Sequence, residues 1–264
     1  MVLQHLNQEQ VDLLGVSLQK RNEANFALGN IASMLSGIPG LRGAWIASSF
    51  DENGDIFDIS EQGRDVSYNG TPEFDYSALI PYATFDGVND YFERLDEAGL
   101  DITGTETYVA SAKRGLTIGG WFYFENTPTF QLMTKALFLN DLSYYLWINA
   151  GVPQLTISSG GSAITATSVI STETAAQNTW YFIVGSYDPS TEMNIYINNT
   201  KTQLAAGVPA SIFSGAADFQ IGGLDGAATN RLEGRFSFGF LSAMFLSDTI
   251  IGNLWQQSRS LFGV

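Results

Sequence analysis

The chain has 264 residues, of which 45% are hydrophobic and 13% aromatic, so it can bury a sizeable core and is not expected to be disordered. It carries 27 acidic and 12 basic residues, a formal charge of −15, which argues against a phosphate-binding surface for nucleic acid and against anionic membranes. The sequence contains no cysteine, and therefore offers neither a disulfide framework nor a thiolate metal site.

The first residues bear on whether the chain carries a signal peptide. Residues 1–7 contain neither a basic n-region nor a long apolar h-region, so we expect no signal peptide. No run reaches the roughly 18 apolar residues that a membrane-spanning helix requires. We therefore expect a protein made in a cytosol without a membrane span.

Residues 1–40 are predicted to be an N-terminal helical oligomerisation or docking segment, with the helix over residues 7–36. Asn7 and Gln10 have the spacing of a capping box, and the Gly and Pro of residues 36–40 end the pattern. Between them, residues spaced alternately by three and four form a heptad-like seam with a polar middle. The seam consists of Val11, Leu14, Leu18, Arg21, Asn25, Leu28, Ala32 and Leu35.

Two interpretations of this helix remain open. The favoured one is a self-association stalk, expected to be trimeric, or a peg that docks on a larger assembly, because a polar position such as Asn25 can fix register and oligomer state. The alternative is an amphipathic helix that lies on its own β domain. Gly15 and Gly29 each weaken an unbroken helix by about 1 kcal/mol relative to Ala.

Residues 41–264 are predicted to form one antiparallel β domain, because the apolar pattern changes to a period of two. Short aromatic or β-branched runs alternate with Gly-rich turns, which favours a two-sheet sandwich over a βαβ fold. The clearest candidate strands cover residues 83–85, 116–124, 144–148, 154–157, 180–186, 193–197, 219–221 and 235–245. Residues 248–262 are expected to form a short helix with Asp248 as its N-cap.

Several motifs of this domain resemble laminin-G-like domains of the concanavalin A-like lectin family. A Trp-bearing first strand ending at Trp45 is followed by the turn of residues 58–63, and both resemble the opening of that family. Three further motifs arrive in the family's order: residues 85–91 (FDGVNDY), residues 116–121 (LTIGGW), and residues 178–188 (NTWYFIVGSYD) with the strand after them. A fifth, residues 221–223 (IGG) with the LEG of residues 232–234, is similar to the family's close.

The resemblance implies a jelly-roll sandwich that binds carbohydrates or protein ligands, often with calcium at a sheet rim. It covers roughly residues 41–262 and leaves residues 1–40 outside. The family's usual last strand is replaced here by the aromatic run of residues 236–245.

Catalytic residues are not evident. Retaining glycosidases need two carboxyl groups about 5 Å apart, and the sequence has no Glu-x-Asp-x-x-Glu strand that would supply them. His5 is the only histidine, so a Ser-His-Asp triad or a histidine zinc site has no raw material. We therefore predict a protein that is not an enzyme.

Calcium is the one metal that the residues suggest. Asp51, Asn53 and Asp55 place oxygen side chains at i, i+2 and i+4, which suits a hard cation, although an ordinary polar turn has the same composition. Asp225 and Asn230 lie in a second polar loop, which would meet a ligand at the end of a sandwich or serve as a plain connection.

Aromatic residues are weighed as a sugar-stacking platform. Trp121, Trp147 and Trp180 stand in apolar strands and are expected in the core. Tyr144, Tyr145 and Tyr196 are expected to be better exposed.

The function predicted from these features is that of a non-enzymatic structural virion protein, such as a phage capsid decoration, head-fibre or tail-attachment protein. In this interpretation the N-terminal segment joins subunits or contacts capsid or tail proteins, and the jelly roll projects outward to meet surface glycans. The lack of cysteine and of a visible signal peptide motivates it, because phage proteins assemble in a reducing cytosol. The alternative is an extracellular carbohydrate-binding or adhesive module of a bacterium, and a degenerate glycosidase is the third possibility.

Overall fold

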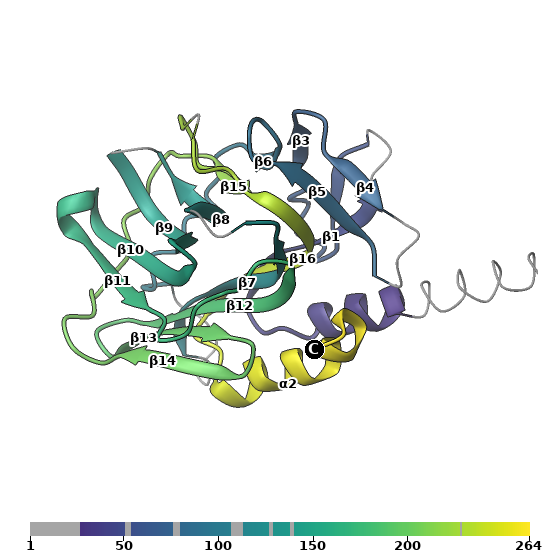
Figure 1. The fold of residues 1–264 in the computed structure, drawn as a ribbon. Helices are drawn as coiled ribbons and strands as arrows, with labels where there is room; N and C mark the ends of the chain where they lie inside the picture. The colour runs from purple at the N-terminus through teal and green to yellow at the C-terminus, as the bar shows by residue number, and fades with distance from the viewer. Residues whose placement is uncertain are drawn as a thin grey trace, which may run out of the picture.

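The computed structural model describes residues 27–50, 54–75, 80–106, 113–126, 129–137, 140–227 and 229–264. The predicted fold class is confirmed: two antiparallel sheets pack face to face into a jelly-roll sandwich, with helical segments near both ends of the chain (Figure 1). Within the described residues, no helix is long and apolar enough to cross a membrane.

The larger sheet, sheet A, has nine strands. Its main path is, in spatial order, β14 (Thr200–Leu204), β13 (Glu192–Ile197), β12 (Thr179–Asp188), β7 (Arg114–Phe124), β16 (Glu233–Met244), β1 (Leu41–Phe50) and β2 (Ile56–Asp58). Strand β5 (Tyr82–Asp86) pairs with the start of β16, and β4 (Glu73–Asp75) pairs with β5.

The smaller sheet, sheet B, has seven strands. They are, in spatial order, β11 (Ala166–Ile170), β10 (Val152–Ser162), β9 (Asn140–Asn149), β8 (Phe130–Ala136), β15 (Phe219–Ile221), β6 (Tyr91–Arg94) and β3 (Ser67–Asn69). A short 3-10 turn, η1 (Ala163–Thr165), joins β10 to β11. Sheet B is apolar only toward sheet A, since polar residues such as Thr134 and Thr156 alternate with core residues along its strands.

Sheet A is apolar on both faces. On β1, Trp45 belongs to the core between the sheets, whereas its neighbours Ala44 and Ile46 belong to a second apolar cluster on the other face. Strand β12 alternates in the same way, with Ile183 inside and Phe182 outside. Because side chains alternate along a strand, such a sheet must be covered twice.

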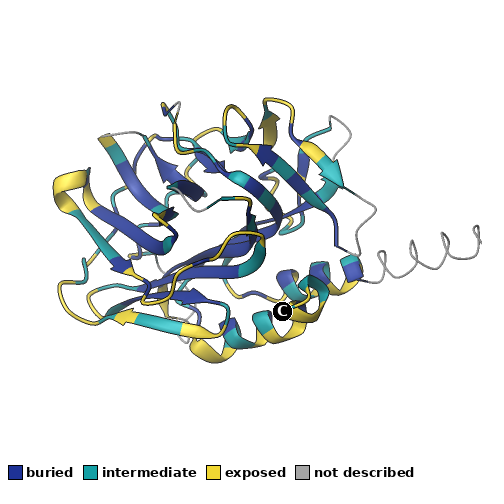
Figure 2. Cartoon of the chain, in the orientation of Figure 1, coloured by how far each residue is buried: buried dark blue, intermediate teal, exposed yellow. Residues whose placement is uncertain are grey.

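Two helical segments provide the second cover. The helix of residues 27–36 buries Ala27, Ile31 and Leu35 in the outer cluster. The C-terminal helix α2 (Asp248–Ser258) buries Ile251 and Leu254 in the same cluster, and the 3-10 helix η2 (Arg259–Phe262) follows it. Both lie on the side of the sandwich away from sheet B and expose polar residues on their far faces (Figures 1 and 2).

Polar contacts hold α2 on the sheet. Tyr196 of β13 donates its hydroxyl to Asp248 at 2.7 Å, and Lys201 of β14 lies 3.0 Å from the same carboxylate. The N-cap position is occupied by Ser247, and Asp248 is the first residue of the helix. The prediction of Asp248 as the N-cap was therefore one residue late. At the other end of the helix, Trp121 donates its indole N–H to the Ser258 hydroxyl at 2.9 Å.

The seam residues divide between described and undescribed parts of the chain. Val11, Leu14, Leu18 and Asn25 lie outside the described residues, so the stalk stays a prediction. Leu35 is fully buried, and Leu28 is half-buried against the outer cluster, so this end of the seam packs on the chain's own sandwich.

Replacing Leu35 by Ala should lower the free energy of unfolding by about 2–5 kcal/mol, because the change leaves a cavity under the helix. Chemical denaturation followed by tryptophan fluorescence measures the change. The exposed Ser33→Ala variant of the same helix should change stability by less than about 0.5 kcal/mol. A Leu35→Ala protein as stable as the parent would show that the helix is not part of the folded unit.

Candidate functional site

The outer face of sheet A carries a row of aromatic and polar residues beside the C-terminal cover. The strand register places Trp180 opposite Tyr123, Tyr123 opposite Arg235, Arg235 opposite Thr84, and Thr84 opposite Glu73. Directly opposed residues point to one face of a sheet. The row therefore crosses β12, β7, β16, β5 and β4 and continues the face that the helices cover elsewhere.

A cleft of about 460 Å³ opens over the β4 end of this row. Its lining combines aromatic rings, carboxylates and one guanidinium: Glu73, Phe74, Asp75, Tyr82, Thr84, Glu125 and Arg235. A second hollow of about 400 Å³ lies between the helix of residues 27–36 and the C-terminal helices, and the described residues of its lining include no charged or aromatic side chain. The cleft is therefore the better candidate for specific binding, since convergent polar groups fix the orientation of a ligand.

Arg235 organises the cleft. Its guanidinium carbon lies 4.8 Å from the centre of the Tyr82 ring and 4.6 Å from that of Tyr123, within cation–π range of both. The guanidinium also pairs with Glu125 at 3.5 Å. Its Nε–H is buried and has no acceptor among the described residues.

Tyr82 lines the cleft, and Trp180 packs beside it on the same face of the sheet. Tyr82 donates its hydroxyl to Asp75 at 2.7 Å, and burial together with this hydrogen bond raises the pKa of the Tyr82 phenol, so it stays neutral and donates. The centre of the Trp180 ring lies 5.8 Å from the ring centre of Tyr82, 5.6 Å from that of Tyr123 and 5.0 Å from that of Phe262 in η2. Half-buried aromatic faces beside hydrogen-bonding groups suit a ligand with apolar faces and hydroxyl edges.

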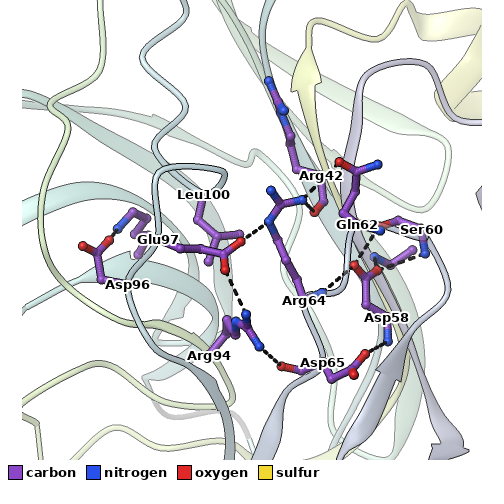
Figure 3. Close-up of polar contacts among 12 residues, drawn as sticks. Arg42, Asp58, Ser60, Gln62, Arg64, Asp65, Arg94, Asp96, Glu97 and Leu100 are labelled. Carbon is purple, nitrogen blue, oxygen red and sulfur yellow. Dashed lines mark hydrogen bonds and ion pairs between the residues drawn. The ribbon is translucent and has the colours of Figure 1, made fainter. Parts of the chain in front are cut away.

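A second cluster of charged residues lies at the turn of residues 58–65 and is structural (Figure 3). The buried Asp58 carboxylate accepts hydrogen bonds from the backbone N–H groups of Ala44 (2.9 Å), Ser60 (3.0 Å) and Arg64 (3.0 Å), and from the Ser60 hydroxyl (2.8 Å). Four donors leave this carboxylate little capacity to bind a ligand. The Asp58 turn that resembles the family's opening motif therefore closes β2 against β1.

Arg64 links this turn to the sandwich. Its side chain pairs with Glu97 and donates to the Arg42 carbonyl at 2.7 Å (Figure 3). The Trp45 indole donates to the Arg64 carbonyl at 2.7 Å. Arg94 pairs with the other oxygen of Glu97 at 2.9 Å. Each charge is thus met by an opposite one, as buried charges require.

Lys135 anchors two loops beside this network. Its fully buried ammonium pairs with Asp96 and, at 3.2 Å, with Asp101. It also donates to the carbonyls of Gly215 (3.0 Å) and Ala217 (2.9 Å). The lysine therefore fastens the loops on either side of it and is not available to a ligand.

The predicted calcium residues are only partly described. Asp51 and Asn53 lie outside the described residues, and Asp55 is half-buried just before β2. Within the described residues, no group of three or more carboxylate or histidine side chains could hold a metal ion. Calcium binding stays a prediction.

The predicted ligand loop makes contacts within the protein. The Asp225 carboxylate accepts the backbone N–H of Asp218 at 3.2 Å, and the Asn230 carbonyl accepts that of Gln131 at 2.9 Å. Asn230 has a left-handed backbone (φ 62°), as Asn tolerates in turns. Neither residue lines the cleft.

The aromatic residues depart in part from expectation. Trp121 is fully buried, as expected, whereas Trp147 and Trp180 are half-buried. The predicted exposure of Tyr144 and Tyr196 was wrong: their exposed fractions are 0% and 4%, because Tyr144 faces sheet A and Tyr196 lies under α2. Tyr145 is half-buried on the outer face of sheet B, with its ring 5.6 Å from that of Trp147.

Sequence reasoning missed Tyr82, Tyr123 and Arg235. The available signal was Arg235, the single charged residue in the aromatic-rich segment of residues 234–246. Its partners could not be identified from that signal, since they come from strands distant in sequence.

A family model described as "Concanavalin A-like lectin/glucanases superfamily" matches residues 99–238. No curated protein sequence matches the chain.

Solved structures of botulinum neurotoxin binding domains have a similar fold. The receptor-binding domain of the C/D mosaic serotype superposes with a TM-score of 0.61 at 11% identity, over 82% of this chain and 51% of that one. The serotype D ligand-binding domain, in complex with N-acetylneuraminic acid, gives 0.60 at 12% identity over 86% and 52%. The serotype DC binding domain, in complex with rat synaptotagmin II, gives 0.58 at 14% over 84% and 52%. The chain spans about half the length of these domains, and the likeness concerns the fold.

The Arg64–Glu97 pair should make the free energy of unfolding depend on pH in the acid range. Burial raises the pKa of Glu97, but the hydrogen bond from Arg94 and the charge of Arg64 outweigh burial and hold it below the ordinary 4.5. The stabilisation is therefore present above pH 4.5 and is lost as the pH falls through the lower folded-state pKa.

Glu97→Gln should lower the free energy of unfolding by about 1–3 kcal/mol at pH 7, and by less at each step below pH 4.5. Urea denaturation across this range measures the effect, with the exposed Glu61→Gln as control. An unchanged difference at every pH would contradict this account of the pair.

Proposed function

The chain belongs to the concanavalin A-like lectin/glucanases superfamily, and on that premise we propose that its sandwich binds glycans without catalysing their breakdown. The observation that carries the proposal is the cleft that Tyr82 and Arg235 line on the outer face of sheet A, where the Arg235 guanidinium also lies over the Tyr123 ring. A pyranose ring presents apolar C–H faces and hydroxyl edges, and this cleft offers aromatic walls together with fixed donors and acceptors.

The similar solved structures support the proposal at the level of fold. One neurotoxin binding domain was solved with N-acetylneuraminic acid and another with rat synaptotagmin II, and this chain matches about half of each of those binding domains. Fold alone does not transfer a ligand, because function depends on the site. The cleft therefore carries the proposal.

Absence of catalysis is part of the proposal. The single histidine, His5, and the lack of a Glu-x-Asp-x-x-Glu strand support it. In the cleft, Asp75 accepts the Tyr82 hydroxyl and Glu125 pairs with Arg235, contacts that suit fixed binding groups.

A finer proposal concerns the role of residues 1–26. We propose that residues 1–26 join copies of the chain, as a trimer, and attach them to capsid or tail proteins of a virus particle, with the cleft directed outward. The seam of Val11, Leu14, Leu18 and Asn25 supports this, as does the anchoring of residues 27–36 on the sandwich, which would couple a stalk firmly to the domain. A bacterial adhesive module outside the cell is the alternative.

Glycan binding should depend on the cleft. A glycan array identifies a bound sugar, and calorimetry then compares variants. Tyr82→Ala and Arg235→Met should each weaken binding about tenfold or more, equivalent to about 1.4 kcal/mol. Phe57→Ala removes an aromatic residue that is 41% exposed and does not line the cleft, and should leave affinity unchanged. If Tyr145→Ala abolishes binding and Tyr82→Ala does not, the site lies on sheet B instead.

Self-association should depend on the seam. Light scattering of the full chain is expected to give the mass of a trimer, and Leu14→Ser with Leu18→Ser should reduce it to that of a monomer. Leu13→Ser with Val16→Ser makes similar apolar-to-Ser changes off the seam and should leave the trimer intact. A monomeric parent chain at all concentrations tested would contradict the stalk.

A further inference from the structure

The charge of the cleft carries an inference about its ligand, which rests on the proposed glycan-binding function. We propose that the cleft selects glycans bearing a free amino group, such as unacetylated hexosamines, over matched neutral glycans, and disfavours glycans bearing carboxylates. The charged residues around the cleft and their placement support this.

The cleft is acidic overall. Its lining holds three carboxylates, of Glu73, Asp75 and Glu125, against the single guanidinium of Arg235. No lysine or second arginine lines it among the described residues.

Arg235, the one cation among the described residues of the lining, is already engaged. Arg235 lies over both the Tyr82 and Tyr123 rings and pairs with Glu125 at 3.5 Å. Placing a ligand carboxylate there would require it to compete with Glu125 for the same guanidinium. A sialic acid therefore meets net negative charge, whereas an ammonium group meets complementary charge.

The acidic edge of the Tyr82 wall favours the same ligand. The Tyr82 and Tyr123 rings already face the Arg235 guanidinium, so the carboxylates of the cleft are the groups that would attract a ligand cation. The Asp75 carboxylate, which accepts the Tyr82 hydroxyl at 2.7 Å, brings a negative charge to the edge of this ring. A protonated hexosamine can thus place its ammonium near a carboxylate beside the Tyr82 ring.

The size of the effect follows from a cleft that is open to solvent. One unit of ligand charge beside the solvent-exposed carboxylates of the cleft should change the binding affinity by roughly tenfold at low salt. The effect should shrink as salt is added, because exposed charges are screened.

The experiment compares matched sugars by calorimetry with the full chain. Glucosamine oligomers are paired with their N-acetylated counterparts, and sialyllactose is paired with lactose, at a pH where the amine is protonated. We expect the amino form to bind about tenfold more tightly than the acetylated form at low salt, and sialyllactose to bind more weakly than lactose. Both differences should narrow at 0.5 M salt, as screening requires.

A variant tests the cause. Glu73 is exposed at the end of the row, so Glu73→Gln removes one charge with little risk to the fold. It should reduce the preference for the amino form several-fold. Glu173→Gln, an exposed change between β11 and β12, should leave the preference unchanged.

The outcomes separate this inference from the proposed function. Equal affinity for amino and acetylated sugars, or tighter binding of sialyllactose than lactose, would overturn the charge selection while glycan binding stands. A preference that Glu73→Gln leaves intact would overturn its assignment to the cleft. Binding of none of these sugars, nor of any sugar on the array, would overturn the proposed function and this inference together.

Discussion

Sheet A is apolar on both of its faces, and the rest of the architecture depends on this. One face meets sheet B in the main core; the other presents Ile46, Trp121, Phe182 and Phe238, which water would otherwise reach. Burial of apolar surface is the dominant favourable contribution to folding. The helix of residues 27–36 and the C-terminal helix are therefore integral to the domain, although they lie outside the sandwich.

The same constraint places the candidate site. Where the helical cover ends, the outer face of sheet A changes from purely apolar residues to Trp180, Tyr123 and Arg235, and the cleft opens there. The ring centre of Phe262 lies 4.1 Å from that of Trp121 and 5.0 Å from that of Trp180. The last aromatic residue of the C-terminal helices therefore packs against Trp180, the first residue of the aromatic and polar row. Cover and site are thus adjoining parts of one surface.

Charge in the core serves the fold, whereas charge in the cleft is available for recognition. Asp58 and Arg64 are surrounded by donors and acceptors of the protein itself, and Lys135 fastens two loops. Groups satisfied in this way stabilise a single arrangement but offer nothing to a ligand. The cleft, in contrast, has the exposed Glu73 carboxylate in its lining.

Local patterns determined much of the fold. Alternation of apolar residues predicted strands β7, β12 and β13, and the order of aromatic and Gly motifs indicated a jelly roll before any contact was known. The Asp58 turn could also be identified from residues 58–63, because its hydrogen bonds are short-range along the chain. These features depend on neighbours in sequence, which a single sequence displays.

Only the tertiary structure decided which face of each strand is covered, and which sheet or helix covers it. Alternation separates the faces of a strand but does not say which is covered, so Tyr144 and Tyr196 were expected to be exposed and are buried. Likewise, the seam pattern at Leu35 suits a partner chain or the chain's own sheet equally well, and the structure places it on the sheet. The cleft joins Glu73, Glu125 and Arg235 from segments far apart in sequence, and their meeting follows from long-range register, which no local pattern encodes.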